Sequence, residues 1–180
     1  YIFACMCRNG DGIRIDKHKA EKYFRYAADE GHVRSMYNVA CMYKSEGFLK
    51  DELLAAKYFK MAALKGHIES MYNYALMLKK GKEIEANKQE AAEYFKIAAD
   101  NGHIDSMKNY AYMLFLGDGI KINKPEAAKY FKLAADKGDS LSMRNYALML
   151  RYGKKIEDNK IEAANYYKLA ADLGDVRSMY

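Results

Sequence analysis

Histidine is the residue type in this sequence that most readily suggests chemistry. His32, His67 and His103 share one phase of a repeating pattern, each directly after a glycine. Zinc needs ligand nitrogens about 2 Å from the ion, whereas equivalent positions in stacked helical repeats lie roughly 9–10 Å apart. The same phase holds Asp139 and Asp175, which suits a residue that starts a helix. We therefore expect helix-start residues here, with no metal site and no cofactor.

Asparagine recurs at a second fixed phase, although it is a poor helix former. The four copies are Asn38, Asn73, Asn109 and Asn145. An amide carries both a donor and an acceptor, so a row of amides could hold a peptide backbone without reading its sequence. Alternatively, each amide forms hydrogen bonds within or between repeats. The sequence leaves both interpretations open.

The other polar motifs indicate turns and solvated surface. Gly10-Asp11-Gly12 and Gly117-Asp118-Gly119 lack the lysine of a phosphate loop and the spaced carboxylates of a calcium loop, so we expect turns. Lysines that recur at one phase are interpreted as a solvated stripe: Lys60, Lys96, Lys132 and Lys168. No set of nucleophile, base and acid is apparent, which predicts that the chain is not an enzyme.

Composition limits the class of protein. The 180 residues are 51% hydrophobic with a formal net charge of +6, too small an excess to favour nucleic acid strongly. No run of about 18 apolar residues predicts a membrane span. The three cysteines, Cys5, Cys7 and Cys41, are odd in number and are interpreted as reduced thiols, which favours the cytoplasm. Because the chain opens at Tyr1 and stops partway into a pattern, we expect it to be a segment of a longer protein.

Internal similarity decides the expected fold. A segment that begins Ser70-Met71-Tyr72-Asn73 recurs from Ser35, Ser106 and Ser142, and its start recurs at Ser178. It alternates with a segment such as Ala91–Asp100. Glycines end the second segment at spacings of 35, 36, 36 and 36 residues: Gly31, Gly66, Gly102, Gly138 and Gly174. We predict a single array with repeats at 35–69, 70–105, 106–141 and 142–177, a partial repeat at 1–34 and the start of another at 178–180.

Both segments have helical periodicity, and we name them helix A and helix B in that order. Ala91, Phe95 and Ala98 fall at i, i+4 and i+7 on one face of helix B, with small residues around a ring. Residues of the capping type precede helix B: Asp16, Asp51, Asn87, Asn123 and Asn159, the last three with Glu three positions later. Helix A ends near a glycine: Gly81, Gly117 or Gly153. A lone pair of such helices cannot cover its apolar faces, so stacking and a superhelix are expected.

The pattern resembles the Sel-one-like repeat, a relative of the tetratricopeptide repeat. The resemblance rests on Asn109–Leu114, on the loop Gly117–Ile120 and on Lys124–Gly138, and it extends through essentially the whole chain. The family usually has glycine where this chain has alanine: Ala75, Ala111 and Ala147. The resemblance implies an all-α fold, a right-handed superhelix of antiparallel helix pairs, and a role as a scaffold or adaptor in signalling.

The resemblance also implies a site, because related repeats line the concave groove with helix A. The groove would then bind a protein or peptide that carries acidic and apolar residues. The residues expected to line it are Tyr37, Asn38, Tyr72, Asn73, Leu76, Lys79, Lys108, Asn109, Tyr112, Phe115, Arg144, Asn145, Leu148 and Arg151. Two alternatives remain open: that the chain is the repeat region of a multidomain signalling enzyme such as a kinase, and that its paired helices bind RNA.

Overall fold

The computed structural model describes residues 1–45, 50–82, 84–152 and 159–179. Within these residues the chain forms α-helices and one short 3₁₀ helix, with no strand. Two compact units are present, Tyr1–Ala86 and Asn87–Tyr180. Unit 1 contains α1 (Ile2–Asn9), α2 (Lys17–Asp29), α3 (Val33–Lys44), α4 (Glu52–Leu64) and α5 (Ile68–Lys80). Unit 2 contains α6 (Lys88–Asp100), α7 (Ile104–Leu116), α8 (Lys124–Asp136), α9 (Ser140–Tyr152), α10 (Lys160–Asp172) and the 3₁₀ helix Val176–Ser178.

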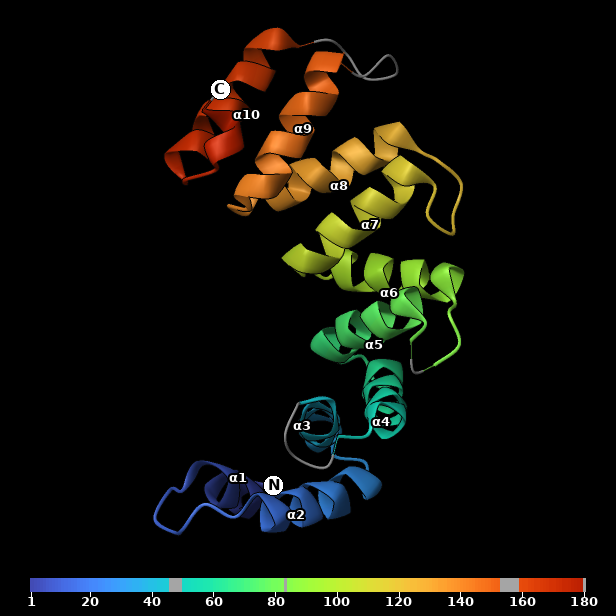
Figure 1. The fold of residues 1–180 in the computed structure, drawn as a ribbon, viewed down its shortest axis with the longest axis vertical. Helices are drawn as coiled ribbons and strands as arrows, with labels where there is room; N and C mark the ends of the chain where they lie inside the picture. The colour runs from blue at the N-terminus through green and yellow to red at the C-terminus, as the bar shows by residue number, and fades with distance from the viewer. Residues whose placement is uncertain (46–49, 83, 153–158, 180) are drawn as a thin grey trace. The chain divides into compact units, whose positions relative to one another are not determined.

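Within each unit, every helix packs against the next one in the chain (Figure 1). The contacts run from α1 to α5 in unit 1 and from α6 to α10 in unit 2. The predicted A helices are α3, α5, α7 and α9, and the predicted B helices are α2, α4, α6, α8 and α10. Stacking in chain order, which the repeat pattern predicted, is therefore observed inside both units.

The B helices begin where the capping residues were expected. Asn123 Oδ1 accepts a hydrogen bond from the backbone N–H of Glu126 at 3.2 Å, and Asn123 Nδ2 donates to Glu126 Oε2 at 2.8 Å. In a capping box the glutamate usually accepts from the backbone N–H of the cap residue. Here the backbone N–H of Asn123 donates to the Leu114 carbonyl at 2.9 Å, so the Glu126 carboxylate binds the side-chain amide of Asn123 instead. The bond to Leu114 ties the start of α8 to the end of α7, so one residue both caps a helix and closes a loop.

Glycine ends the helices through a backbone conformation that other residues rarely adopt. The five glycines between a B helix and the following A helix have φ between +86° and +94°, in the left-handed region that a Cβ disfavours. Gly81 and Gly117 end α5 and α7 with φ of +58° and +74°. Gly153 and the loop around Gly47 lie outside the described residues.

The core of each unit is built from the predicted large and small residues of helix B. Phe24, Phe59, Phe95 and Phe131 are buried, and the alanines that flank them on the same face are buried too. Small neighbours allow the next helix to approach the ring closely, and each ring contributes roughly 1.5–3 kcal/mol of burial free energy. Residues of helix A such as Met107 and Leu114 complete this core.

Membrane insertion was not expected from the sequence. Among the described residues, no helix combines the length and the apolar character that crossing a bilayer requires.

Candidate functional site

The residues predicted to line a groove all lie on A helices and all reach solvent. On α7, Lys108, Asn109 and Tyr112 are half-buried and Phe115 is exposed, whereas Tyr110 and Leu114 on the opposite face are buried. The same division holds on α3, α5 and α9, so the predicted residues share one face of each helix. We call this the exposed A face. Whether it binds a partner stays a prediction.

The recurrent asparagines on this face already form hydrogen bonds within the chain. Asn38 accepts from Arg8 Nη1 at 2.8 Å, and Asn73 accepts from Lys44 Nζ at 2.7 Å. Asn109 Nδ2 donates to the Asp105 carbonyl at 2.9 Å, one turn earlier in its own helix. These contacts give an intramolecular reason for a poor helix former at this phase.

Asn145 shows how the amides connect neighbouring repeats. Its Nδ2 donates to the hydroxyl of Tyr112 at 2.6 Å, which joins α9 to α7. The Tyr112 ring lies edge-on to Phe131, with ring centroids 5.0 Å apart. Tyr112 and Asn145 therefore help to fix the register of the two A helices, in addition to facing solvent.

A second row of the exposed A face meets the residue that directly precedes the helix two elements further along the chain. In unit 1, the Tyr37 ring lies beside His67, with centroids 4.9 Å apart. In unit 2, Lys108 Nζ lies 3.1 Å from Asp139 Oδ1, and Arg144 Nε lies 3.4 Å from Asp175 Oδ2. An aromatic residue thus faces histidine, and a cation faces aspartate.

Sequence reasoning missed this matching, although the signal was present. The two residues of each pair are 30 or 31 positions apart in the sequence. Repeats with tyrosine at the first position have histidine at the second, and repeats with lysine or arginine at the first have aspartate at the second. The consequence for the site is electrostatic. The side chains of Lys108 and Arg144 are only 20% and 13% exposed and are already paired with carboxylates, so they have little free charge to offer an acidic partner.

The three histidines act as helix caps, as the sequence predicted. His67 Nδ1 accepts from the backbone N–H of Ser70 at 3.2 Å and lies 2.9 Å from Ser70 Oγ. His32 and His103 make the same contacts with the serine three residues later. Burial lowers the pKa of His67, which favours the neutral ring that can accept a hydrogen bond. No group of three or more potential metal ligands occurs in the part of the chain that the structure describes.

Three of the four recurrent B-helix lysines are exposed, as a solvated stripe requires, and the fourth, Lys132, is half-buried. Lys132 Nζ donates to Glu162 Oε1 at 2.9 Å and to the Tyr166 hydroxyl at 3.0 Å, so it bridges α8 to α10. These hydrogen bonds, to Tyr166 first and then to Glu162, raise the pKa of Lys132. Lys96 pairs instead with Asp100 in its own helix at 2.9 Å. Lys132 therefore also bonds to acidic and phenolic neighbours in the next repeat, while its side chain remains 42% exposed.

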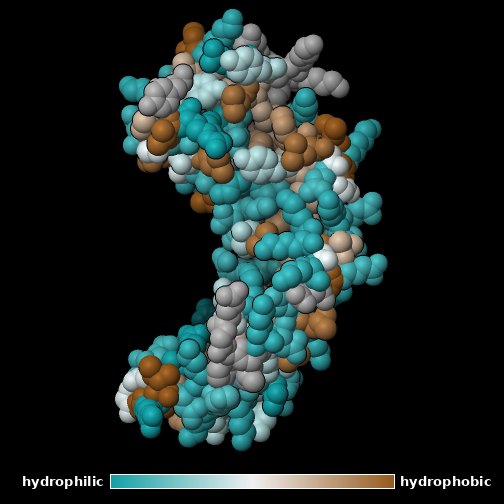
Figure 2. All heavy atoms as spheres, in the orientation of Figure 1, coloured by the Kyte–Doolittle hydropathy of each residue, from teal (hydrophilic) through white to brown (hydrophobic). Residues whose placement is uncertain are grey.

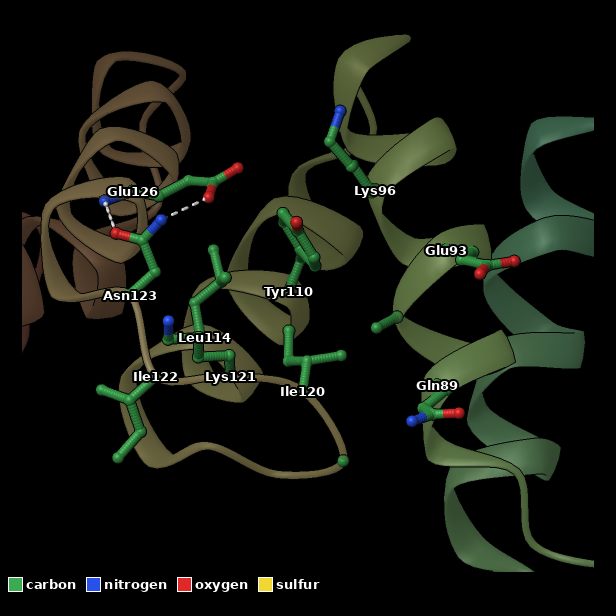
Figure 3. A pocket seen from close by; sticks show the side chains of 12 residues that line it. Gln89, Glu93, Lys96, Tyr110, Leu114, Ile120, Lys121, Ile122, Asn123 and Glu126 are labelled. Atoms are coloured by element: carbon green, nitrogen blue, oxygen red, sulfur yellow. Dashed lines mark hydrogen bonds between the residues drawn. The ribbon is translucent and has the colours of Figure 1, made fainter.

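A cleft of about 700 Å³ lies in unit 2 between α6 and the loop that leads into α8 (Figure 3). Its lining includes Gln89 and Glu93 of α6, Tyr110 of α7 and Ile120 of the loop. The loop passes so close to α6 that a Cβ at Gly119 would collide with Lys88. Lys88 Nζ also donates to Asp118 Oδ1 at 2.6 Å. The predicted turn is thus observed, and its aspartate fastens the loop to α6.

The chain was compared with protein families and with curated proteins. Five consecutive segments match the Sel1 repeat: residues 4–32, 33–67, 68–103, 104–139 and 140–175. Together they cover nearly all of the chain. No curated protein matches the sequence.

Solved structures similar to the chain are repeat proteins. A protective antigen of uropathogenic Escherichia coli strains, displaying an SLR fold, is 23% identical with a TM-score of 0.94; the match covers 99% of this chain and 38% of that one. A Sel1 repeat protein from Oxalobacter formigenes is 22% identical with a TM-score of 0.90, covering 99% and 74%. An immunity protein from Pseudomonas aeruginosa is 21% identical with a TM-score of 0.53, covering 99% and 65%.

These likenesses establish the fold and nothing finer. The all-α repeat superhelix predicted from the sequence is confirmed. The chain spans about two fifths of the first of these structures and about three quarters of the second.

Proposed function

The chain belongs to the Sel1 repeat family, and on this basis we propose that it is a scaffold whose exposed A face binds a peptide or a partner domain. Sel1 repeats generally mediate interactions between proteins. The observation that carries the proposal is that all of the predicted groove residues reach solvent, on helices whose opposite faces are buried. The alternative of a signalling enzyme gains no support from the comparisons.

The contacts described above support binding because they hold the exposed A face in place. Asn73 receives a hydrogen bond from Lys44, and Asn145 donates to Tyr112, so adjacent A helices are connected by side chains within each unit. A surface that is already ordered loses less conformational entropy when it binds. A rigid row of exposed side chains suits a scaffold better than a site that must assemble around a reacting group.

Peptide selection on the whole chain tests the proposal. A random 12-residue display library is panned on residues 1–180, and the affinities of the enriched peptides are measured by fluorescence anisotropy. Two variants alter the exposed A face: Leu76→Ser with Lys79→Glu on α5, and Phe115→Ser with Leu148→Ser on α7 and α9. The control changes exposed leucines on B helices, Leu53→Ser with Leu133→Ser.

We expect at least one A-face variant to weaken binding about tenfold, as is usual when central interface residues are truncated, while the control variant binds as the unchanged chain does. Circular dichroism of each variant confirms that it is folded. A selection that enriches no peptide, or peptides whose affinity neither A-face variant alters, refutes the proposal.

We also propose that the chain acts in the cytoplasm. Cys5, Cys7 and Cys41 are all free thiols, and thiols persist in reducing compartments. Thiol alkylation of the protein in intact cells, followed by mass spectrometry, should find the half-buried Cys5 and Cys41 modified only after cell lysis or with a membrane-permeant reagent, and the buried Cys7 modified only after denaturation. Modification of Cys5 or Cys41 by an impermeant reagent on intact cells would refute the proposal.

A further inference from the structure

The exposed A face of unit 2 is unusually apolar near the C-terminal ends of its helices. Phe115 and Leu116 at the end of α7 are 36% and 65% exposed, and Leu148 and Tyr152 at the end of α9 are 41% and 65% exposed. We call these four residues the α7–α9 patch. Figure 2 shows apolar side chains at several places over the α8–α10 region of the face that it displays.

A side-chain hydrogen bond connects the two helices that carry the patch. Tyr112 of α7 and Asn145 of α9 are joined by a hydrogen bond of 2.6 Å. Phe115 and Leu148 each lie three residues further along, which is the same helical face almost one turn on. Leu133 of α8 is exposed as well, and Leu169 and Leu173, four residues apart at the C-terminal end of α10, are neighbours that form another exposed apolar pair.

Two cations lie against the rings of the α7–α9 patch. The Lys124 ammonium lies 5.5 Å from the centre of the Phe115 ring, and the Arg151 guanidinium lies 5.0 Å from the centre of the Tyr152 ring. Neither cation pairs with a carboxylate among the described residues. By contrast, Lys108, earlier on α7, is neutralised by Asp139.

We propose that the α7–α9 patch binds a peptide segment that combines at least two large apolar side chains with a flanking Asp or Glu. The inference rests on the proposed function and assigns it a place and a partner chemistry. The apolar side chains cover Phe115 and Leu148, and the carboxylate pairs with Arg151 or Lys124. A second copy of the patch would bring like charges together, so charge complementarity favours a partner of a different sequence.

The peptides enriched on the whole chain provide the test. We expect them to share paired Leu, Ile, Phe, Trp or Met residues beside Asp or Glu. Phe115→Ser with Leu148→Ser should weaken their binding about 10- to 30-fold, whereas Leu133→Ser, which alters a leucine of nearly equal exposure, should not.

Reversing one charge tests how much of the peptide affinity comes from electrostatic attraction. Arg151→Glu should weaken binding about three- to tenfold and reduce its salt dependence. Lys168→Glu changes the net charge equally at an exposed position of α10, and it should leave the affinity unchanged.

The outcomes distinguish this inference from the proposed function. Peptides that depend on Leu76 and Lys79 but not on Phe115 and Leu148 overturn the α7–α9 patch and leave the scaffold proposal standing. Enriched peptides without carboxylates, or with affinities insensitive to Arg151→Glu, overturn the partner chemistry. Self-association that Leu148→Ser abolishes, measured by analytical ultracentrifugation, identifies a second copy as the occupant and also overturns the inference.

Discussion

Protonation of His67 should loosen the start of α5 selectively. In the folded chain its Nδ1 accepts from the backbone N–H of Ser70 and lies against the Ser70 hydroxyl. A protonated imidazole carries N–H groups on both nitrogens and cannot accept. The groups that face the ring are Tyr37, whose centroid is 4.9 Å away, and the charges of Glu69 and Arg34.

The direction of the pH effect follows from the pKa. Burial lowers the pKa of His67 below its usual value of 6.5; Glu69 opposes this shift and Arg34 reinforces it. A histidine with a lowered pKa binds fewer protons when folded, so its stabilising contribution is complete above pH 6.5 and is lost as the pH falls through the folded pKa. Loss of a helix cap costs about 1 kcal/mol, within a range of roughly 0.5–2 kcal/mol.

Asp139 supplies a matched variant from within the chain. Its Oδ2 occupies the same position at the start of α9 and accepts from the Ser142 backbone N–H at 2.8 Å. A carboxylate stays ionised down to pH 5, so His67→Asp keeps a cap where the imidazole loses it. The other histidines are the same in both proteins, so their contributions cancel when the two are compared.

Hydrogen exchange of the Ser70 amide, followed by NMR between pH 7.5 and 5.0, measures the effect locally. A local probe is needed because repeat arrays need not unfold in a single step. We expect the protection factor of the unchanged chain to fall roughly fivefold, which corresponds to about 1 kcal/mol, and that of His67→Asp to remain constant. Equal changes in the two proteins would refute the capping argument.

Two further predictions concern contacts between repeats and loop packing. Replacing Lys108 by Tyr and Asp139 by His together recreates the aromatic pair of unit 1. A double-mutant cycle, read locally from hydrogen exchange of the Ser142 amide, should therefore give a favourable coupling of about 0.5–3 kcal/mol; additive single effects would contradict the matching. Gly119→Ala should cost about 2 kcal/mol or more because its Cβ meets Lys88, whereas Gly12→Ala, at φ +73° in open space, should cost about 1 kcal/mol; equal thermal shifts would show that the loop does not pack as described.

Much of the fold was predictable because its determinants are local. A cap such as Asn123 and its partner Glu126 lie three residues apart, so their hydrogen bonds follow from helix geometry alone. The buried stripe around Phe95 repeats with the helical period. The recurrence of both signals at nearly constant spacing then predicted the array, and the structure confirms the helices within each unit.

The candidate site was predictable only in part. The resemblance to related repeats assigned Phe115 and Leu148 to the groove face of helix A, and both are exposed. The same reasoning assigned Arg144 to partner binding without showing that Asp175 already pairs with it. A position on a face follows from counting residues, whereas the availability of a charge depends on which groups of the next repeat lie opposite.

What the sequence determined by itself was the helices, their ends and their order, because those depend on interactions among residues at most a few positions apart. Only the tertiary structure decided which polar groups are already paired. Lys132 meets Glu162, and Asn145 meets Tyr112, across gaps of about thirty residues. The register of one packed helix against another sets such contacts, and a small axial shift of either helix would give each side chain a different partner.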